Sequence, residues 1–148
     1  MIDRFEGDYA FLSNFWPCTI EYDGVKYPSS EHAFQAAKSD DELTKLRIAK
    51  TATPGDAKRL GRIIKLRPGW DDERLQVMHD ILRIKFSDPE LRLLLLATKQ
   101  KRLIEGNNWG DSYWGVCNGR GSNHLGTLLM KVRNEIRESK KSAGSGTR

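Results

Sequence analysis

A single stretch of the sequence alternates like a β-hairpin, and helical spacing dominates the rest. "CTIEYDGVKYP" (18–28) alternates around Asp23-Gly24, a pair that favours a tight two-residue turn. Most other patterned segments repeat their apolar residues at the spacing of a helix face. We therefore expect an α+β fold, mostly helical, with a small β-hairpin or sheet near the N-terminus.

Several expected helices begin at capping residues. Thr53 can cap a helix that has Pro54 at its first position, and Asp88 can do the same before Pro89. In the helix expected at 71–86, Leu75, Met78 and Leu82 are expected to form the face that packs on the core. The expected helices lie in 28–38, from Thr53 onward, in 71–86, in 88–101 and in 122–139.

The length and the absence of breaks favour one domain. A chain of 148 residues is long enough to bury a core, and it contains no internal repeat or dividing linker. We expect one compact domain over residues 1–139. Residues 140–148 have the composition of a linker, so we expect a disordered basic tail there.

The net charge of +5 is a weak indicator of nucleic-acid binding, because it is concentrated near the C-terminus. Residues 131–148 hold six Lys or Arg and two Glu. No apolar run approaches the ~18 residues of a membrane span, and the N-terminus does not resemble a signal peptide. We expect a cytoplasmic protein without a membrane partner. Cys18 and Cys117 are then reduced thiols, and with three scattered His they show no zinc spacing, so neither metal nor cofactor is expected.

The segment "EGNNWGDSYWG" (105–115) places aromatic side chains among glycines. Glycine allows a ligand or another backbone to come close. One interpretation is a surface loop whose aromatic rings fold back onto the core. The other is a ligand platform, with indoles stacking on a flat ring and Asp111 as a hydrogen-bond or proton partner.

The helix expected at 28–38 carries a polar stripe. Glu31, Gln35 and Lys38 lie within about 40° of one another around the helix axis. The stripe is either a solvated face or a ligand-facing one that presents a carboxylate, an amide and an amine. The basic segment 44–67, which includes Lys58 and Arg62, leaves the same choice between a solvated face and a phosphate clamp.

A glycine pair before the last helix, Gly119-x-Gly121, could offer backbone amides to a phosphate. It is not a dinucleotide fingerprint, because no strand leads into it and His124 occupies the position of the third glycine.

These motifs together resemble the NADAR family, the YbiA-like proteins, over about residues 5–136. The matching segments are "FLSNFWP" (11–17), "YPSSEHAFQAAK" (27–38), "TPGDAKRLGR" (53–62), "MHDILRIKF" (78–86), "LIEGNNWGDSYWG" (103–115) and "GSNHLGTLLMKVR" (121–133). The resemblance implies hydrolysis of N-glycosidic bonds. Implied substrates are ribosylamino-pyrimidine phosphate intermediates of riboflavin synthesis, or ADP-ribose on guanine in a nucleotide or nucleic acid. A cognate ADP-ribosyltransferase toxin is an implied partner, since some members are antitoxins.

The resemblance also suggests roles for individual residues. Glu31, Lys38 and Asp111 are the expected catalytic groups. The expected substrate-binding residues are Asn14, Gln35, Lys58, Arg62, Asn107, Trp109, Gly110, Trp114 and Gly115. Two mechanisms fit, a carboxylate pair acting through water and an imine between Lys38 and the opened sugar. A binding module without turnover, or an antitoxin acting by contact, are the alternatives to an enzyme.

Overall fold

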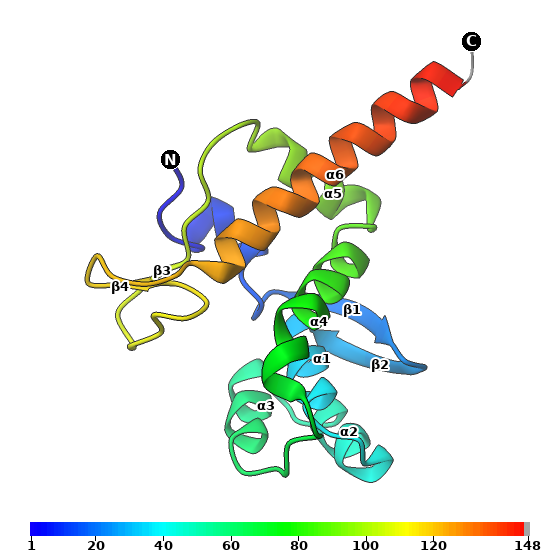
Figure 1. Cartoon of the computed structure of the whole chain (residues 1–148), viewed down its shortest axis with the longest axis vertical. Coiled ribbons are helices and arrows are strands. Elements are labelled where there is room, and N and C mark those ends of the chain that lie inside the picture. The colour runs from blue at the N-terminus through cyan, green and yellow to red at the C-terminus, as the bar shows by residue number, and fades with distance from the viewer. Residues whose placement is uncertain (147–148) are drawn as a thin grey trace. The chain divides into compact units, whose positions relative to one another are not determined.

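Helices account for most of the described chain, and its strands form two short pairs (Figure 1). This computed structural model describes the backbone of residues 1–146 and the side chains of residues 1–140. The mostly helical fold with a small antiparallel sheet near the N-terminus confirms the fold class expected from the sequence. The elements are η1 (Gly7–Leu12), β1 (Pro17–Tyr22), β2 (Val25–Ser29), α1 (Ser30–Ala37), α2 (Glu42–Ala49), α3 (Pro54–Gly61), α4 (Trp70–Lys85), α5 (Pro89–Ala97), β3 (Gly106–Asn107), β4 (Val116–Cys117) and α6 (His124–Gly146).

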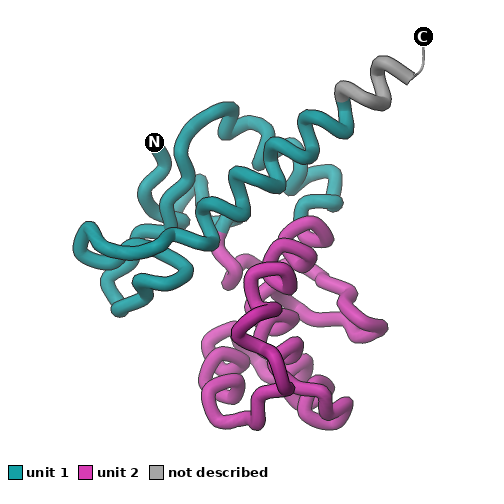
Figure 2. Tube along the Cα trace, viewed as in Figure 1, with its two compact units in different colours: residues 1–12, 86–148 teal, residues 13–85 magenta. Residues whose placement is uncertain are grey.

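The chain divides into two compact units (Figure 2). One consists of Ser13–Lys85, here called the α1 unit, and the other of Met1–Leu12 with the chain from Phe86 onward, here called the α6 unit. The expectation of one domain over residues 1–139 stays a prediction. So does the disordered tail, because the side chains of 141–148 and the backbone of 147–148 lie outside the described residues.

The hairpin forms where the alternation predicted it. Asp23 and Gly24 both have positive φ, 49° and 81°, which matches the right-handed twist of the two strands they join. Ile20 pairs with Tyr27 and both are buried. Ser29 ends β2 and also caps α1, since its side chain accepts a hydrogen bond from the His32 backbone N–H.

Helix α1 is the centre of its unit. It packs against β1, β2, α2, α3 and α4. Its apolar face is buried as expected, and the Phe34 ring lies 5.3 Å from the ring of Trp70 at the start of α4. In α4, Met78 and Leu82 are buried as predicted, whereas Leu75 is exposed because it lies outside the face that packs on the unit. The expectation of a core position for Leu75 is therefore wrong.

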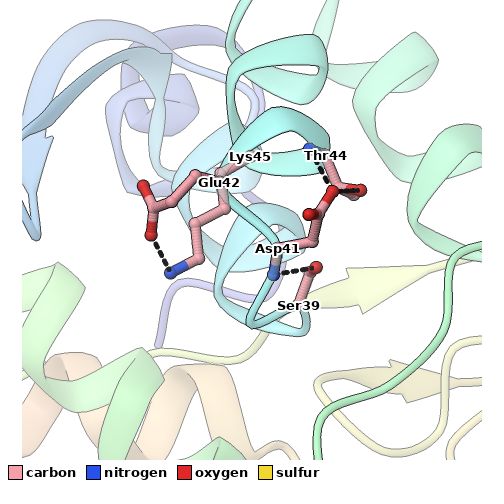
Figure 3. Close-up of polar contacts among 5 residues, drawn as sticks. All are labelled: Ser39, Asp41, Glu42, Thr44 and Lys45. Carbon is pink, nitrogen blue, oxygen red and sulfur yellow. Dashed lines mark hydrogen bonds and ion pairs between the residues drawn. The ribbon is translucent and has the colours of Figure 1, made fainter.

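Helix α2 was not anticipated, although its start has a clear local cause (Figure 3). A side-chain oxygen of Asp41 accepts hydrogen bonds from the backbone N–H of Thr44 at 3.0 Å and from its hydroxyl at 2.7 Å. The Ser39 hydroxyl accepts from the Asp41 backbone N–H at 2.9 Å, and Lys45 pairs with Glu42 at 3.5 Å. The two hydrogen bonds from Thr44 lower the pKa of Asp41, the one from its side chain most strongly, and they cap the start of the helix.

The α6 unit contains α5, α6 and the loop between them. Leu95, Leu103, Leu129 and Val132 are buried in it, while Leu93 in the apolar run of α5 remains exposed. Ile2 pairs with Leu103 through a parallel bridge that brings the N-terminal segment into this unit. Within residues 1–146, no helix combines the length and apolar composition of a membrane span.

Candidate functional site

The polar stripe of α1 is buried. Glu31 is 7% exposed and Gln35 is 5% exposed, since neighbouring helices cover this side of α1 as well as its apolar face. The interpretation of the stripe as a solvated face is therefore wrong for these two residues. Buried polar groups need partners, because burial without a hydrogen bond costs about 1–3 kcal/mol. The partners of the stripe are consequently informative about its role.

Gln35 and Glu31 are partners of each other. The Gln35 side-chain amide donates a hydrogen bond from Nε2 to Glu31 Oε1 at 2.8 Å, across one helical turn. The other end of the amide faces α3, where Gly61 lies against it. A β-carbon at position 61 would overlap Gln35 Oε1 and lie 2.7 Å from Gln35 Cδ. Glycine at 61 thus allows α3 to approach this part of α1.

Lys38 follows α1 as its C-capping residue. Its ammonium lies 5.9 Å from the centroid of the Phe34 ring, and its side chain is half-buried. Burial lowers the pKa of Lys38, because it removes water from the charged amine. Glu31 opposes this shift in the pKa of Lys38, and cations from neighbouring helices reinforce it. The arrangement therefore makes Lys38 a weaker base than a fully solvated lysine, with the Glu31 charge acting against this change.

The cations that act on Lys38 come from two helices. Lys58 and Arg62 lie in α3 and at its C-cap, where the sequence predicted them as phosphate ligands. Lys58 is half-buried and Arg62 is exposed. The third is Arg74 of α4, which sequence reasoning missed. Only the packing of α4 on α1 reveals it, because nothing in the spacing of 71–86 distinguishes Arg74 from an ordinary charged residue.

Asn14 lies at the start of α1, where its contacts are structural. Its backbone carbonyl accepts from the Glu31 backbone N–H at 3.0 Å, and its Oδ1 accepts from the Ser30 hydroxyl at 2.9 Å. Its Nδ2 donates to the Met78 sulfur at 3.6 Å. Asn14 thus anchors the turn that carries Glu31, and its expected contact with a substrate stays a prediction.

The aromatic loop belongs to the α6 unit, and two side chains determine its path. Asn107 donates from Nδ2 to the Asp111 carbonyl at 2.8 Å and accepts the Asp111 N–H at 3.0 Å. Asp111 Oδ1 accepts from the N–H groups of Tyr113 and Trp114 at 3.1 and 2.9 Å. These are the contacts of a side chain that stabilises a turn. Asn107 and Asp111 therefore have structural roles in addition to any role at a substrate.

Trp109 and Trp114 of the loop differ in exposure, and each fits a different one of the two interpretations, a ligand platform and a loop folded onto the core. Trp109 is 58% exposed. Trp114 is half-buried, with its ring 4.9 Å from that of Tyr113, and the Tyr113 ring lies 4.5 Å from that of His124 in α6. Trp114 thus folds back into an aromatic cluster, while Trp109 offers its face for stacking.

The glycines of the loop also differ. Gly110 has a φ of 90° and open space around it, so it serves the turn. Gly115 is buried, and a β-carbon there would overlap Glu105. Its closest neighbours are therefore internal, and the approach of a ligand to Gly115 stays a prediction.

The backbone amides at the start of α6 are used within the unit. The N–H groups of Ser122, His124 and Leu125 donate to carbonyls of the aromatic loop at 2.8–3.2 Å. The accepting carbonyls belong to Ser112, Tyr113 and Trp114. A phosphate bound at the start of α6 would have to displace these bonds, so the structure gives no support to a phosphate site there.

The predicted residues thus form two groups, each within its own unit. Glu31, Gln35, Lys38, Lys58 and Arg62 gather on α1 and α3, and the loop residues from Asn107 to Gly115 gather in the α6 unit. Among the described residues, no group of three or more His, Cys, Asp or Glu side chains is arranged to hold a metal ion.

Comparisons with known proteins agree with the motif pattern. "N-glycosidase YbiA" of Shigella sonnei is 44% identical over 133 residues, which cover 87% of this chain and 82% of that protein. A riboflavin biosynthesis protein of Vibrio vulnificus is 39% identical over 135 residues, which cover 88% of this chain and 36% of that protein. The NMR structure of Escherichia coli YbiA matches with a TM-score of 0.82 at 40% identity, covering 95% of this chain and 89% of that one.

The predicted enzyme class, an N-glycosidase, is the one that the Shigella relative carries in its name. The family model described as the NADAR domain matches residues 3–137. Because this match spans nearly the whole chain and relatives above 40% identity cover most of it, the chain belongs to the NADAR family.

Proposed function

We propose that this chain hydrolyses the N-glycosidic bond between a ribose and an amine-bearing base. The observation that carries the proposal is the pair formed by buried Glu31 of α1 and half-buried Lys38 at its C-cap, in which a carboxylate and an amine with a lowered pKa share one helical face. Cleaving such a bond requires a proton for the leaving amine and stabilisation of the anomeric carbon. Glu31 and Lys38 have these capacities.

The proposed substrates share a flat base, a ribose and a phosphate. The Vibrio relative is named a riboflavin biosynthesis protein, which supports a substrate from that synthesis, and a ribosylamino-pyrimidine phosphate is the one that we propose. ADP-ribose on the guanine amino group has the same three parts. Lys58 and Arg62 suit the phosphate, because guanidinium and ammonium groups bind it strongly. The exposed indole of Trp109 suits the base or the sugar face. With ADP-ribosylated guanine as substrate, a guanine-modifying toxin is the corresponding partner.

In the route that we favour, Lys38 forms a covalent intermediate. The C1′–O4′ bond of the sugar opens as the lone pair of the leaving nitrogen forms a C1′=N bond, and solvent water supplies the proton that O4′ takes. Neutral Nζ of Lys38 attacks C1′ and releases a proton through Glu31 to the leaving nitrogen, whose bond to C1′ then breaks. Water adds to the resulting imine, Lys38 departs and the free sugar closes. The lowered pKa of Lys38 supports this route, since only the neutral amine is a nucleophile.

The second route uses water directly. One carboxylate activates the water while another acid protonates the leaving amine, with Glu31 and Asp111 as the two groups. Lys38 would then act only as a charge. The two routes differ in whether a covalent sugar adduct forms on the protein.

The deciding experiment incubates EDTA-treated protein with each proposed substrate and measures the released base. We expect release from at least one of them, loss of release in Lys38→Met, and unchanged release in Lys50→Met, which alters an exposed lysine at the end of α2. Tight binding of ADP-ribose without release of base from either substrate would contradict the proposed enzyme and indicate a binding module. Protection from a toxin that survives loss of both Glu31 and Lys38 would indicate an antitoxin acting by contact.

A further inference from the structure

Gln35 is held between two neighbours that leave its side-chain amide little freedom. On one side its Nε2 donates to Glu31 Oε1 at 2.8 Å. On the other side its Oε1 is buried and has no hydrogen-bond partner among the described residues. Buried oxygens of this kind usually accept a hydrogen bond. A steric constraint is therefore needed to explain why Oε1 stays in this position.

That constraint is Gly61. The Gly61 backbone lies so close to Oε1 that a β-carbon at this position would overlap the oxygen and approach Gln35 Cβ to 3.1 Å. Helix α3 therefore closes off Oε1 from this side and fixes the plane of the amide. Within that plane, the Glu31 carboxylate selects the orientation that turns the N–H toward it, because a carboxylate accepts hydrogen bonds and does not donate them.

We propose that Gln35 is a positioning residue, not a substrate ligand, that Gly61 fixes the plane of its amide, and that the N–H donated in this plane holds Glu31 as a carboxylate before the reaction begins. The inference rests on the proposed function for the catalytic use of Glu31. It extends that function by assigning Gln35 a different task and by including Gly61, which acts through its contact with Gln35.

The physical reason is the polarity of the hydrogen bond. An N–H donor stabilises a carboxylate more than a carboxylic acid, so its removal favours protonation. The surrounding charges act in the same direction, since Lys58 of α3, Arg62 at its C-cap and Arg74 of α4 are cations in this region. In the imine route a carboxylate is the form that can take the proton from attacking Lys38 and pass it on.

The first test needs no substrate and therefore remains valid if the proposed function fails. The Glu31 carboxyl is titrated by carbon-detected NMR in the wild type, Gln35→Met, Gly61→Ala and Gly55→Ala. Loss of a hydrogen bond to a charged group should raise the titration midpoint in the first two variants by about 1 pH unit, a tenfold change. Gly55 also lies in α3, but a β-carbon there meets nothing closer than 3.8 Å, so Gly55→Ala should match the wild type.

The second test uses turnover and a double-mutant cycle. Gln35→Met and Gly61→Ala should each lower kcat about tenfold with little change in KM, and combining them should be no worse than either alone. Gln35→Ala with Gly61→Ala removes the overlapping amide and should recover melting temperature without recovering kcat. Equal Glu31 midpoints in Gln35→Met and wild type, or a loss of kcat that follows melting temperature in every variant, would overturn the inference. Should Gly61→Ala fail to fold, the comparison of Gln35→Met with wild type decides by itself.

Discussion

Asn107 and Asp111 hold each other through two hydrogen bonds, from Asn107 Nδ2 to the Asp111 carbonyl at 2.8 Å and from the Asp111 N–H to Asn107 Oδ1 at 3.0 Å. The Asp111 carboxylate in turn accepts two backbone N–H groups. The motif residues of the loop therefore build its backbone. A loss of activity on mutating Asp111 must accordingly be separated from a loss of this turn.

Asp111→Asn and Asp111→Ala should separate the two roles. Asparagine keeps an oxygen for the N–H groups of Tyr113 and Trp114, so we expect a melting temperature close to that of the wild type. Alanine removes this acceptor and should cost about 1–2 kcal/mol of stability. If the carboxylate takes part in catalysis, both variants lose turnover. Normal turnover by Asp111→Asn, measured on folded protein, would restrict Asp111 to the turn.

Trp109→Ala should weaken substrate binding without destabilising the protein. Its indole is mostly exposed, so truncation removes little buried surface. Loss of stacking on a base should cost about 1–3 kcal/mol of binding, seen as a higher KM or Kd. Trp114→Ala is the matched comparison. Because the Trp114 ring packs on Tyr113, this substitution should lower the melting temperature. A lower melting temperature for Trp109→Ala with an unchanged KM would contradict the interpretation of the loop as a ligand platform.

Borohydride added during turnover should trap a sugar adduct on Lys38, located by peptide mass mapping. The reason is that the imine route passes through a reducible C=N bond. Lys38→Arg keeps the positive charge and cannot form this bond, so it should bind product and be nearly inactive. Turnover by Lys38→Arg close to that of the wild type would leave the water route with Glu31 and Asp111.

Lys85 should make stability depend on pH in the alkaline range. It is 1% exposed and donates to the Ser13 carbonyl at 2.8 Å, and burial lowers its pKa from 10.5 to about 8. Between these values the unfolded chain keeps a proton that the folded chain has lost, so the free energy of unfolding rises with pH. From pH 8 to pH 10.5, the free energy of unfolding of the wild type should therefore rise by on the order of 3 kcal/mol more than that of Lys85→Met.

The measurement is urea unfolding across this range, with Lys26→Met as the control because Lys26 is exposed on β2. Comparing each variant with the wild type cancels the contributions of Tyr22 and Tyr27, whose pKa values burial raises. Parallel curves for the wild type and Lys85→Met would show that Lys85 has an ordinary pKa in the folded chain.

Local features of the fold followed from the sequence because their causes are local. Asp23-Gly24 sets the hairpin turn, and Ser29, Thr53 and Asp88 cap the helices expected after them. Helix α2 was not predicted, although Asp41 caps it in the same way, because it lacks an apolar stripe that faces the core: Leu43 and Leu46 are exposed, and Ile48 is its buried residue.

The candidate site also combines features that local sequence predicts with features that depend on tertiary packing. The sequence by itself determined that Glu31, Gln35 and Lys38 share one face of a helix, since helical geometry places residues at these intervals together. Their burial, the contact of Gln35 with Gly61 and the presence of Arg74 depend on how α3 and α4 pack on α1. That packing joins residues far apart in the chain, which no local spacing encodes. Desolvation, the largest cause of the lowered Lys38 pKa, exists only once these helices have excluded water.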